Sequence, residues 1–204
     1  MLDDKDLSES TLRLLVWQAL KKWPTRPLIS LVLDPDPIVR TGAAKELHMR
    51  RSPEIYEKAK KLCAHRRDDA REIGAFVLGQ LGTPKFPFRT KSIPILANLL
   101  SRDRSADVRA AAAASLGHLN ANEAIDQLVR AAKDSNVVVR ECVAFALGFL
   151  EPSEEVERVA HTLAKDKDKD VRGWAKLSLE SLHDKKSART DRRKGQRREK
   201  NAKK

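Results

Sequence analysis

Residues 139–150 read VRECVAFALGFL, and the pattern in this stretch decides the fold. It recurs as AREIGAFVLGQL at residues 70–81 and as VRAAAAASLGHL at residues 108–119. In each copy an apolar residue precedes an arginine, small or apolar residues follow, and a leucine stands seven positions after the arginine. Positions −1, +3 and +7 from the arginine share one face of an α-helix. The pattern therefore predicts an amphipathic helix that is repeated along the chain.

The repeat extends in both directions from these three copies. Successive arginines are 31, 38, 31 and 32 residues apart, a period that fits two helices and two turns per unit. They are Arg40, Arg71, Arg109, Arg140 and Arg172. A weaker copy at Leu12, Arg13 and Leu20 opens the chain.

Aspartates lie just upstream of each arginine, where their carboxylates can accept hydrogen bonds from the free N–H groups of a helix start. They place second helices near residues 37–49, 68–81, 106–119, 137–150 and 169–183. First helices then fall near residues 25–33, 53–64, 92–101, 122–133 and 154–165. Glycines at position +8, namely Gly79, Gly117 and Gly148, suit a C-terminal helix stop.

The composition agrees with an all-α protein. The 204 residues are 41% hydrophobic but only 4% aromatic, so aliphatic side chains must fill the core. The formal net charge is +12, but residues 185–204 hold eleven Lys or Arg against two acidic residues. This tail carries +9 and leaves +3 for residues 1–184, so the basic signal belongs to the tail.

These features resemble the HEAT-repeat superfamily, in particular its short bacterial, phycobilisome-lyase-like form, over residues 28–182. The resemblance implies a right-handed α-solenoid of about five stacked helix pairs, with second helices lining the inner curve. It also implies that the Asp and Arg positions bridge neighbouring repeats. We expect a capping helix or degenerate repeat at residues 1–24, the solenoid at 25–183, and a disordered basic tail at 184–204.

Two interpretations compete for the row of five arginines. A basic stripe could follow a phosphate backbone. However, every one of these arginines has an aspartate within a few residues, so partners for a structural ladder are already present. We therefore expect Arg40, Arg71, Arg109, Arg140 and Arg172 to form a structural ladder.

The sequence offers no catalytic constellation and predicts no cofactor or metal. No two of the five histidines are three or four residues apart, and no His-Glu dipeptide of the deoxyhypusine hydroxylase type is present. HEAT-like DNA glycosylases need a tryptophan and a carboxylate in a basic cleft, whereas Trp17, Trp23 and Trp174 fall near the ends of the chain. A lyase or glycosylase stays the weakest alternative, and we predict a protein that is not an enzyme.

The cell compartment is predicted from cysteines and hydropathy. Cys63 and Cys142 show no disulfide or metal spacing, the first residues lack a signal peptide, and no apolar stretch is long enough to span a membrane. We expect a cytoplasmic protein without a membrane partner. The sequence leaves its oligomeric state open.

Two segments outside the repeat are candidate binding elements. The insertion GTPKFPFRT at residues 82–90 carries Phe86 and Phe88, which either form an exposed recognition element or tuck into the groove between repeats. The tail could bind a polyanion such as nucleic acid, grip an acidic protein, or only keep the chain in solution. Its candidate polyanion-binding residues are Arg189, Arg192, Arg193, Lys194, Arg197 and Arg198.

A second resemblance concerns function. The runs REIGAFVLGQLG at 71–82, KFPFRTKSIPIL at 85–96 and VRGWAKLSL at 171–179 are similar to HEAT-repeat proteins encoded beside bacterial Rhs-type polymorphic toxins. That resemblance implies an immunity protein whose concave face clamps a toxin domain and closes its active site. Glu72 and Glu141 would then be candidate contacts on the second helices. The alternative is a nucleic-acid-associated protein that uses the basic tail.

Overall fold

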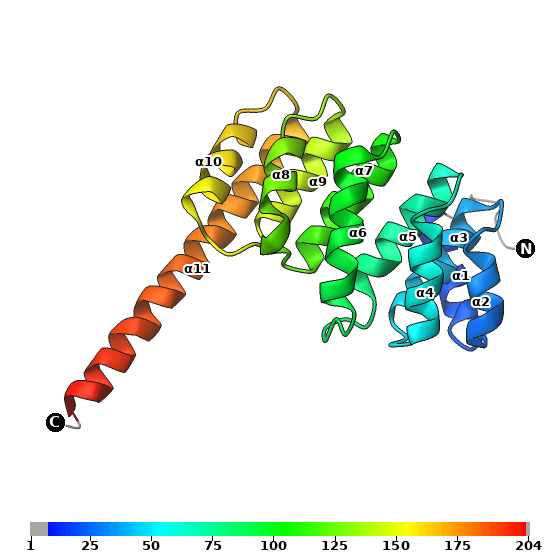
Figure 1. Cartoon of the computed structure of the whole chain (residues 1–204), viewed down its shortest axis with the longest axis horizontal. Helices are drawn as coiled ribbons and strands as arrows, with labels where there is room; N and C mark the ends of the chain where they lie inside the picture. The colour runs from blue at the N-terminus through cyan, green and yellow to red at the C-terminus, as the bar shows by residue number, and fades with distance from the viewer. Residues whose placement is uncertain (1–7, 203–204) are drawn as a thin grey trace, which may run out of the picture.

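The computed structural model describes the backbone of residues 8–202, and every regular element in that range is helical (Figure 1). A first helix, α1 (Glu9–Leu20), precedes five helix pairs. The pairs are α2 (Thr25–Leu31) with α3 (Pro37–His48), α4 (Pro53–Leu62) with α5 (Asp68–Gln80), α6 (Arg89–Arg102) with α7 (Ala106–His118), α8 (Ile125–Ala131) with α9 (Val137–Leu147), and α10 (Glu154–Leu163) with α11 (Lys169–Ala202). A short 3₁₀ turn, η1 (Asn122–Ala124), leads into α8.

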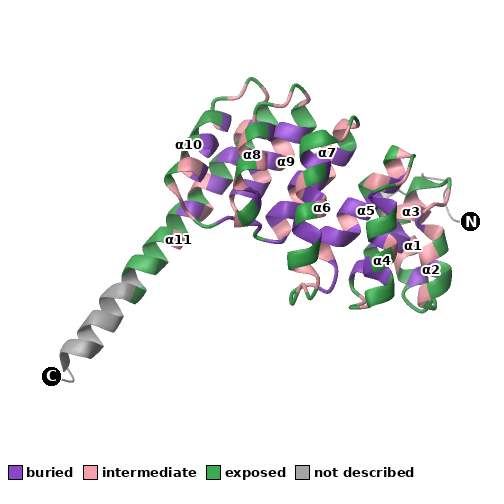
Figure 2. Cartoon of the chain, in the orientation of Figure 1, coloured by how far each residue is buried: buried purple, intermediate pink, exposed green. Residues whose placement is uncertain are grey.

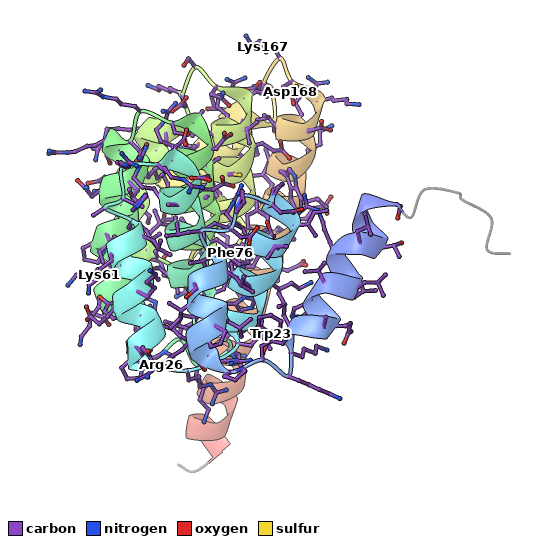
Figure 3. All side chains as sticks on the ribbon, turned by 90° about the vertical axis from the view of Figure 1, so that its right-hand side faces the viewer. Trp23, Arg26, Lys61, Phe76, Lys167 and Asp168 are labelled. Atoms are coloured by element: carbon purple, nitrogen blue, oxygen red, sulfur yellow. The ribbon has the colours of Figure 1, made fainter. Side chains whose placement is uncertain are left out.

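The pairs stack side by side into an α-solenoid, so the predicted fold is confirmed (Figure 1). The odd-numbered helices form one layer, in which α5, α7, α9 and α11 each pack along the next. The even-numbered helices form the other layer and contact one another much less. Seen along the stack, Lys167 and Asp168 mark the edge where even helices turn into odd ones, and Trp23 and Arg26 mark the opposite edge (Figure 3).

Small residues set the spacing of the odd layer. A Cβ added at Gly79 would lie 2.3 Å from the side chain of Ser115, and one at Gly117 would lie 2.7 Å from the Cα of Ala146. These glycines therefore permit helices to approach closely, and Gly79 and Gly117 lie within their helices rather than beyond the ends. Our expectation that glycines at position +8 act as helix stops is wrong for these two, whereas Gly148 is the C-cap residue of α9 as expected.

The core is aliphatic and continuous from α1 to α11. The repeat positions −1 and +7 of the five clear copies fill it, and all of these side chains are buried except the half-buried Val39 and Leu179 in the first and last copies. Figure 2 shows buried residues where helices face one another and exposed residues on the outer surfaces and turns. This burial is what the period of the repeat predicts.

Each ladder aspartate also shapes the turn in which it stands. The carboxylate of Asp103 accepts from the backbone N–H of Ser105 at 3.0 Å, and that of Asp134 accepts from Asn136 at 2.9 Å. Asp36 and Asn136 then cap the helices that follow, through the N–H groups of Ile38 and Val138. The polar turn residues thus fix where each odd helix begins.

The C-terminal segment differs from the expectation of disorder after residue 183. Helix α11 continues without a break to Ala202 and extends away from the stack (Figure 1). Lys185 donates to the carbonyl oxygens of Gly148 and Leu150 at 2.9 Å each, and Arg189 pairs with Glu151 at 3.1 Å. These contacts dock the first turns after the solenoid. The remaining residues of α11 mostly have high helix propensity. They extend a helix that has already formed within the solenoid, so they bear no further cost of nucleation.

Candidate binding surface

The five motif arginines line the edge formed by the even-to-odd turns, and the interior ones join neighbouring repeats. The guanidinium of Arg71 donates two hydrogen bonds to Asp103, at 2.7 and 2.9 Å. Arg109 reaches Asp134 in the same way at 2.8 and 3.0 Å, and Arg140 reaches Asp166 at 2.8 and 3.1 Å. Each partner belongs to the repeat after the arginine, not to the turn just upstream of it.

A third guanidinium nitrogen, Nη1, binds backbone oxygens of the arginine's own turn. In Arg71 it donates to the carbonyls of His65 and Arg66, and in Arg172 to those of Asp166 and Lys167. Arg40 makes the same two contacts, but its Nη2 lies 3.7 Å from the carboxylate of Asp69. Every motif arginine is therefore engaged with protein groups, which leaves little of this row to hold a phosphate backbone.

The ladder shifts the titration of its carboxylates. Hydrogen bonds from Arg71 lower the pKa of Asp103, and those from Arg140 lower the pKa of Asp166. Both carboxylates are almost fully covered by the arginine and the adjoining turn. They are therefore ionised at neutral pH and balance the guanidinium charges.

The side of α5, α7, α9 and α11 that faces away from the even layer is a second surface, which we call the odd-helix face. Counted from the motif arginine of each of these four helices, positions −2, +1, +2, +5 and +9 fall on one side of the helix and form it. Its residues are Asp69, Glu72, Ile73, Phe76, Gln80, Asp107, Ala110, Ala111, Ala114, His118, Val138, Glu141, Cys142, Phe145, Phe149, Asp170, Gly173, Trp174, Leu177 and Ser181. The predicted contacts Glu72 and Glu141 are both part of it.

Glu72 and Glu141 lie in different surroundings on this face. Glu141 is half-buried and its Oε1 accepts a hydrogen bond from the indole N–H of Trp174 at 3.2 Å. Glu72 is exposed to solvent at its side chain, but protein atoms around it remove part of its hydration. This desolvation, together with the negative charge of Asp107, raises the pKa of Glu72.

Aromatic side chains gather at the C-terminal half of the odd-helix face. The ring of Phe145 lies 4.8 Å from that of Phe149 and 5.1 Å from that of Trp174, and His118 completes the group at 5.3 Å from Phe145. Beside them is a shallow hollow of about 330 Å³, lined also by Leu177. Phe149 and Trp174 are each 38% exposed and Leu177 is 55% exposed, so this cluster presents apolar surface to solvent. The sequence analysis missed it, although position +5 carries Phe76, Phe145 and Leu177.

The insertion between α5 and α6 packs against the solenoid. Phe86 and Phe88 are half-buried against the core, and the ring of Phe88 stacks on that of Tyr56 at 4.9 Å. Arg89, at the end of the insertion, pairs with Glu123 at 2.7 Å and donates to the carbonyl of Leu119. The geometry thus favours the tucked arrangement over an exposed recognition element.

The candidate polyanion-binding residues occupy the outer part of α11. Arg189 is tied to Glu151, whereas Arg192 is exposed. The side chains of Arg193, Lys194, Arg197 and Arg198 lie outside the described residues. The tail is thus partly anchored on the last repeat and partly directed away from it.

Groups that could carry chemistry are dispersed. Burial raises the pKa of Cys63 to about 12 and that of Cys142 to about 11, so both remain thiols at neutral pH. Within the part of the chain that the structure describes, no three His, Cys, Asp or Glu side chains gather as metal ligands would. None of the helices described there has the length and apolarity to cross a membrane.

The arrangement of helix pairs has counterparts among known proteins. Residues 93–180, which span the last three pairs, match the family model described as HEAT repeats. Protein YibA of Escherichia coli strain K12 is 28% identical over 170 residues, which are 80% of this chain and 60% of YibA. This chain therefore spans about three fifths of the length of that relative.

Solved structures agree on the fold. An X-ray structure of YibA of E. coli superposes with a TM-score of 0.73 at 27% identity, covering 87% of this chain and 64% of that one. The complex of CpcE and CpcF of phycocyanin lyase from Nostoc sp. PCC7120 gives 0.62 at 19% identity, with 76% and 96% covered. A designed armadillo repeat protein in complex with the peptide (KR)4 gives 0.55 at 17% identity, with 85% and 92% covered. The resemblance to the HEAT-repeat superfamily is confirmed.

Proposed function

We propose that this chain is a non-catalytic binding module whose odd-helix face holds a partner protein. The observation that carries the proposal is the cluster of Phe145, Phe149, Trp174 and Leu177, which no other part of the described chain covers. Large apolar side chains gathered on one exposed surface are typical of interaction sites. Aromatic residues, tryptophan above all, contribute most to protein interfaces.

Proteins of similar fold support this proposal. The CpcE and CpcF subunits form a complex, and the designed armadillo repeat protein was solved with a bound peptide. Both are similar to this chain in fold alone. They show that stacked helix pairs can present a surface to another chain.

The most specific form of the proposal is an immunity protein in the cytoplasm that neutralises a cognate polymorphic toxin. It rests on the resemblance of residues 71–96 and 171–179 to proteins encoded beside Rhs-type toxins. In this form the odd-helix face covers the active site of the toxin domain, with Glu72 and Glu141 among the contacts. Phe86 and Phe88 take part only if the insertion opens from Tyr56.

The test takes as partner an Rhs-type toxin domain encoded beside this gene, and the absence of such a gene would remove this form of the proposal. We expect the full chain to bind this toxin domain and to restore growth of cells that express it. The variant Trp174→Ala/Leu177→Ala should bind at least about tenfold more weakly, because central interface aromatics are worth about 2 kcal/mol or more. Trp23→Ala is the matched control, since Trp23 is 44% exposed at the opposite end of the stack. Equal binding by both variants would contradict the proposal.

A second candidate function is nucleic-acid association through α11. The observation that favours it is the course of this helix, in which residues 185–202, with nine Lys or Arg against two acidic residues, extend away from the stack as one rod (Figure 1). We expect the affinity for DNA to fall steeply as the salt concentration rises. Arg192→Gln/Arg193→Gln should reduce the slope of this dependence by an amount that corresponds to about two phosphate contacts. Fluorescence anisotropy with a labelled DNA duplex measures both quantities. Binding that does not depend on salt would remove this candidate.

A further inference from the structure

The charge of the odd-helix face is opposite to that of the whole chain. The protein carries +12, yet none of the twenty positions of this face is lysine or arginine, while five are Asp or Glu. Asp69 is neutralised by Arg67. The carboxylates of Glu72, Asp107 and Asp170 form no ion pair within the described residues. An anionic partner such as nucleic acid is therefore disfavoured here.

The acidic residues lie near one another across neighbouring helices. Burial is the largest cause of the raised pKa of Glu72 on α5, and the negative charge of Asp107 on α7 raises it further. The nearest opposing cation, Arg40, is held by two carbonyls of its own turn. A cation from outside the chain would relieve the repulsion between Glu72 and Asp107. This part of the surface therefore favours a positively charged partner.

The aromatic cluster extends the same preference. The carboxylate of Glu141 lies against the indole of Trp174, and Phe145 packs edge-on to that indole. A carboxylate beside aromatic rings binds guanidinium and ammonium groups, through charge and through the ring faces. The adjoining hollow has room for the aliphatic stem of a long cationic side chain or for one apolar side chain. Lys185, which also lines it, is already bound to the carbonyls of Gly148 and Leu150.

We infer that the odd-helix face recognises a lysine- and arginine-rich segment of the partner protein, with its cations over Glu72, Asp107 and Glu141 and one long side chain beside Trp174. The inference rests on the proposed function and adds the chemistry of the partner. The acidic and aromatic parts act together, because the first steers a cationic segment and the second holds it.

The test measures binding of a fluorescein-labelled octapeptide of alternating lysine and arginine to the full chain by anisotropy. A glutamate octapeptide is the negative probe. We expect binding of the basic peptide that weakens at least about tenfold between 50 and 500 mM salt, as exposed ion pairs are screened. The glutamate peptide should not bind.

Two matched double variants locate the site. Glu72→Gln/Asp107→Asn removes two charges from the odd-helix face and should weaken peptide binding about tenfold. Glu54→Gln/Glu57→Gln removes two exposed charges from α4, on the other layer, and should change it less than about twofold. Equal effects of the two variants, or no binding of the basic peptide at all, would overturn the inference.

The outcomes separate this inference from the proposed function. If the toxin domain depends on Trp174 and Leu177 but not on Glu72 and Asp107, the binding module stands and the cationic partner is wrong. If neither pair matters, the proposed function fails as well. One alternative remains, in which the basic tail of a second copy of this chain binds the odd-helix face. Sedimentation velocity of the full chain tests it. Oligomers that dissociate at high salt, and that Glu72→Gln/Asp107→Asn also disperses, would show that a second copy of this chain is the partner and would overturn the inference of a different partner protein.

Discussion

The interior repeats and the two ends of the solenoid carry the same motif but make different contacts. Arg109 and Arg140 each bind an aspartate of the next repeat together with carbonyls of their own turn. Arg172 in the last repeat keeps the carbonyl contacts, but no further repeat supplies an aspartate. At the other end Arg40 stands 3.7 Å from Asp69. What a motif arginine contributes therefore depends on the aspartate that the next repeat offers, because the Asp69 that Arg40 faces is already bound by Arg67 and Arg172 has no such partner among the described residues.

The largest effect should come from breaking an interior rung. Arg140→Ala strips Asp166 of two charge-assisted hydrogen bonds where both side chains are nearly buried, at 8% and 11% exposure. We expect a loss of about 3 kcal/mol in the free energy of unfolding. Arg172→Ala, which removes only contacts to carbonyls, should cost about 1 kcal/mol. Urea unfolding followed by circular dichroism measures both, and equal losses would remove the distinction between interior and end.

The next comparison is between two glycines, at which substitution by alanine should change the stability in opposite directions. Gly117→Ala places a Cβ against the backbone of Ala146 and should cost about 2 kcal/mol through overpacking. Gly173→Ala, in the last repeat, meets no atom within 4 Å and should stabilise its helix by about 0.5–1 kcal/mol. Melting temperatures should therefore move in opposite directions. A lower value for both variants would show that a further packing contact covers Gly173.

Acid should weaken the interior rungs. Because the pKa of Asp166 is lower in the folded than in the unfolded chain, its stabilisation is present above the unfolded value of about 3.9 and is lost as pH falls toward the folded value. The stability of the wild type should thus fall as the pH is lowered below about 4, and less steeply in Arg140→Ala. Burial also lowers the pKa of His48 and His118, which removes stability below about pH 6.5 in both proteins alike. Parallel urea midpoints down to pH 3 would contradict the role of the rung.

The smallest effect should come from the contact that ties the tail to the last repeat. Lys185→Met removes the donor to the carbonyls of Gly148 and Leu150 and should cost about 1 kcal/mol. Lys176→Met is the control on the same helix, since Lys176 is exposed and forms no ion pair in the described structure. It should change stability by less than about 0.5 kcal/mol. Hydrogen exchange of α11 should rise in the first variant alone.

The repeat fold could be predicted from the sequence because its period, its leucines and its turn aspartates are local signals. The aspartate that each arginine binds could not be derived from the spacing, since the nearest one in sequence serves its own turn. The role of Gly79 and Gly117 was missed for a related reason, as their constraint comes from the facing helix. The helical tail was missed because apolar periodicity reports burial, whereas Lys185 and Arg189 dock through polar contacts. The odd-helix face appears only when residues from four helices are brought together.

The offset of the rungs has a consequence for the length of such proteins. Each interior arginine finds its carboxylate one repeat later, so a unit such as residues 89–118 contributes Asp103 as the acceptor for Arg71 of the unit before it and Arg109 as the donor to Asp134 of the unit after it. Duplicating that unit adds one complete rung and orphans no charge, whereas cutting inside it leaves a guanidinium and a carboxylate without their counterparts. Growth and loss by whole modules are therefore the electrostatically neutral routes by which this architecture can change in size.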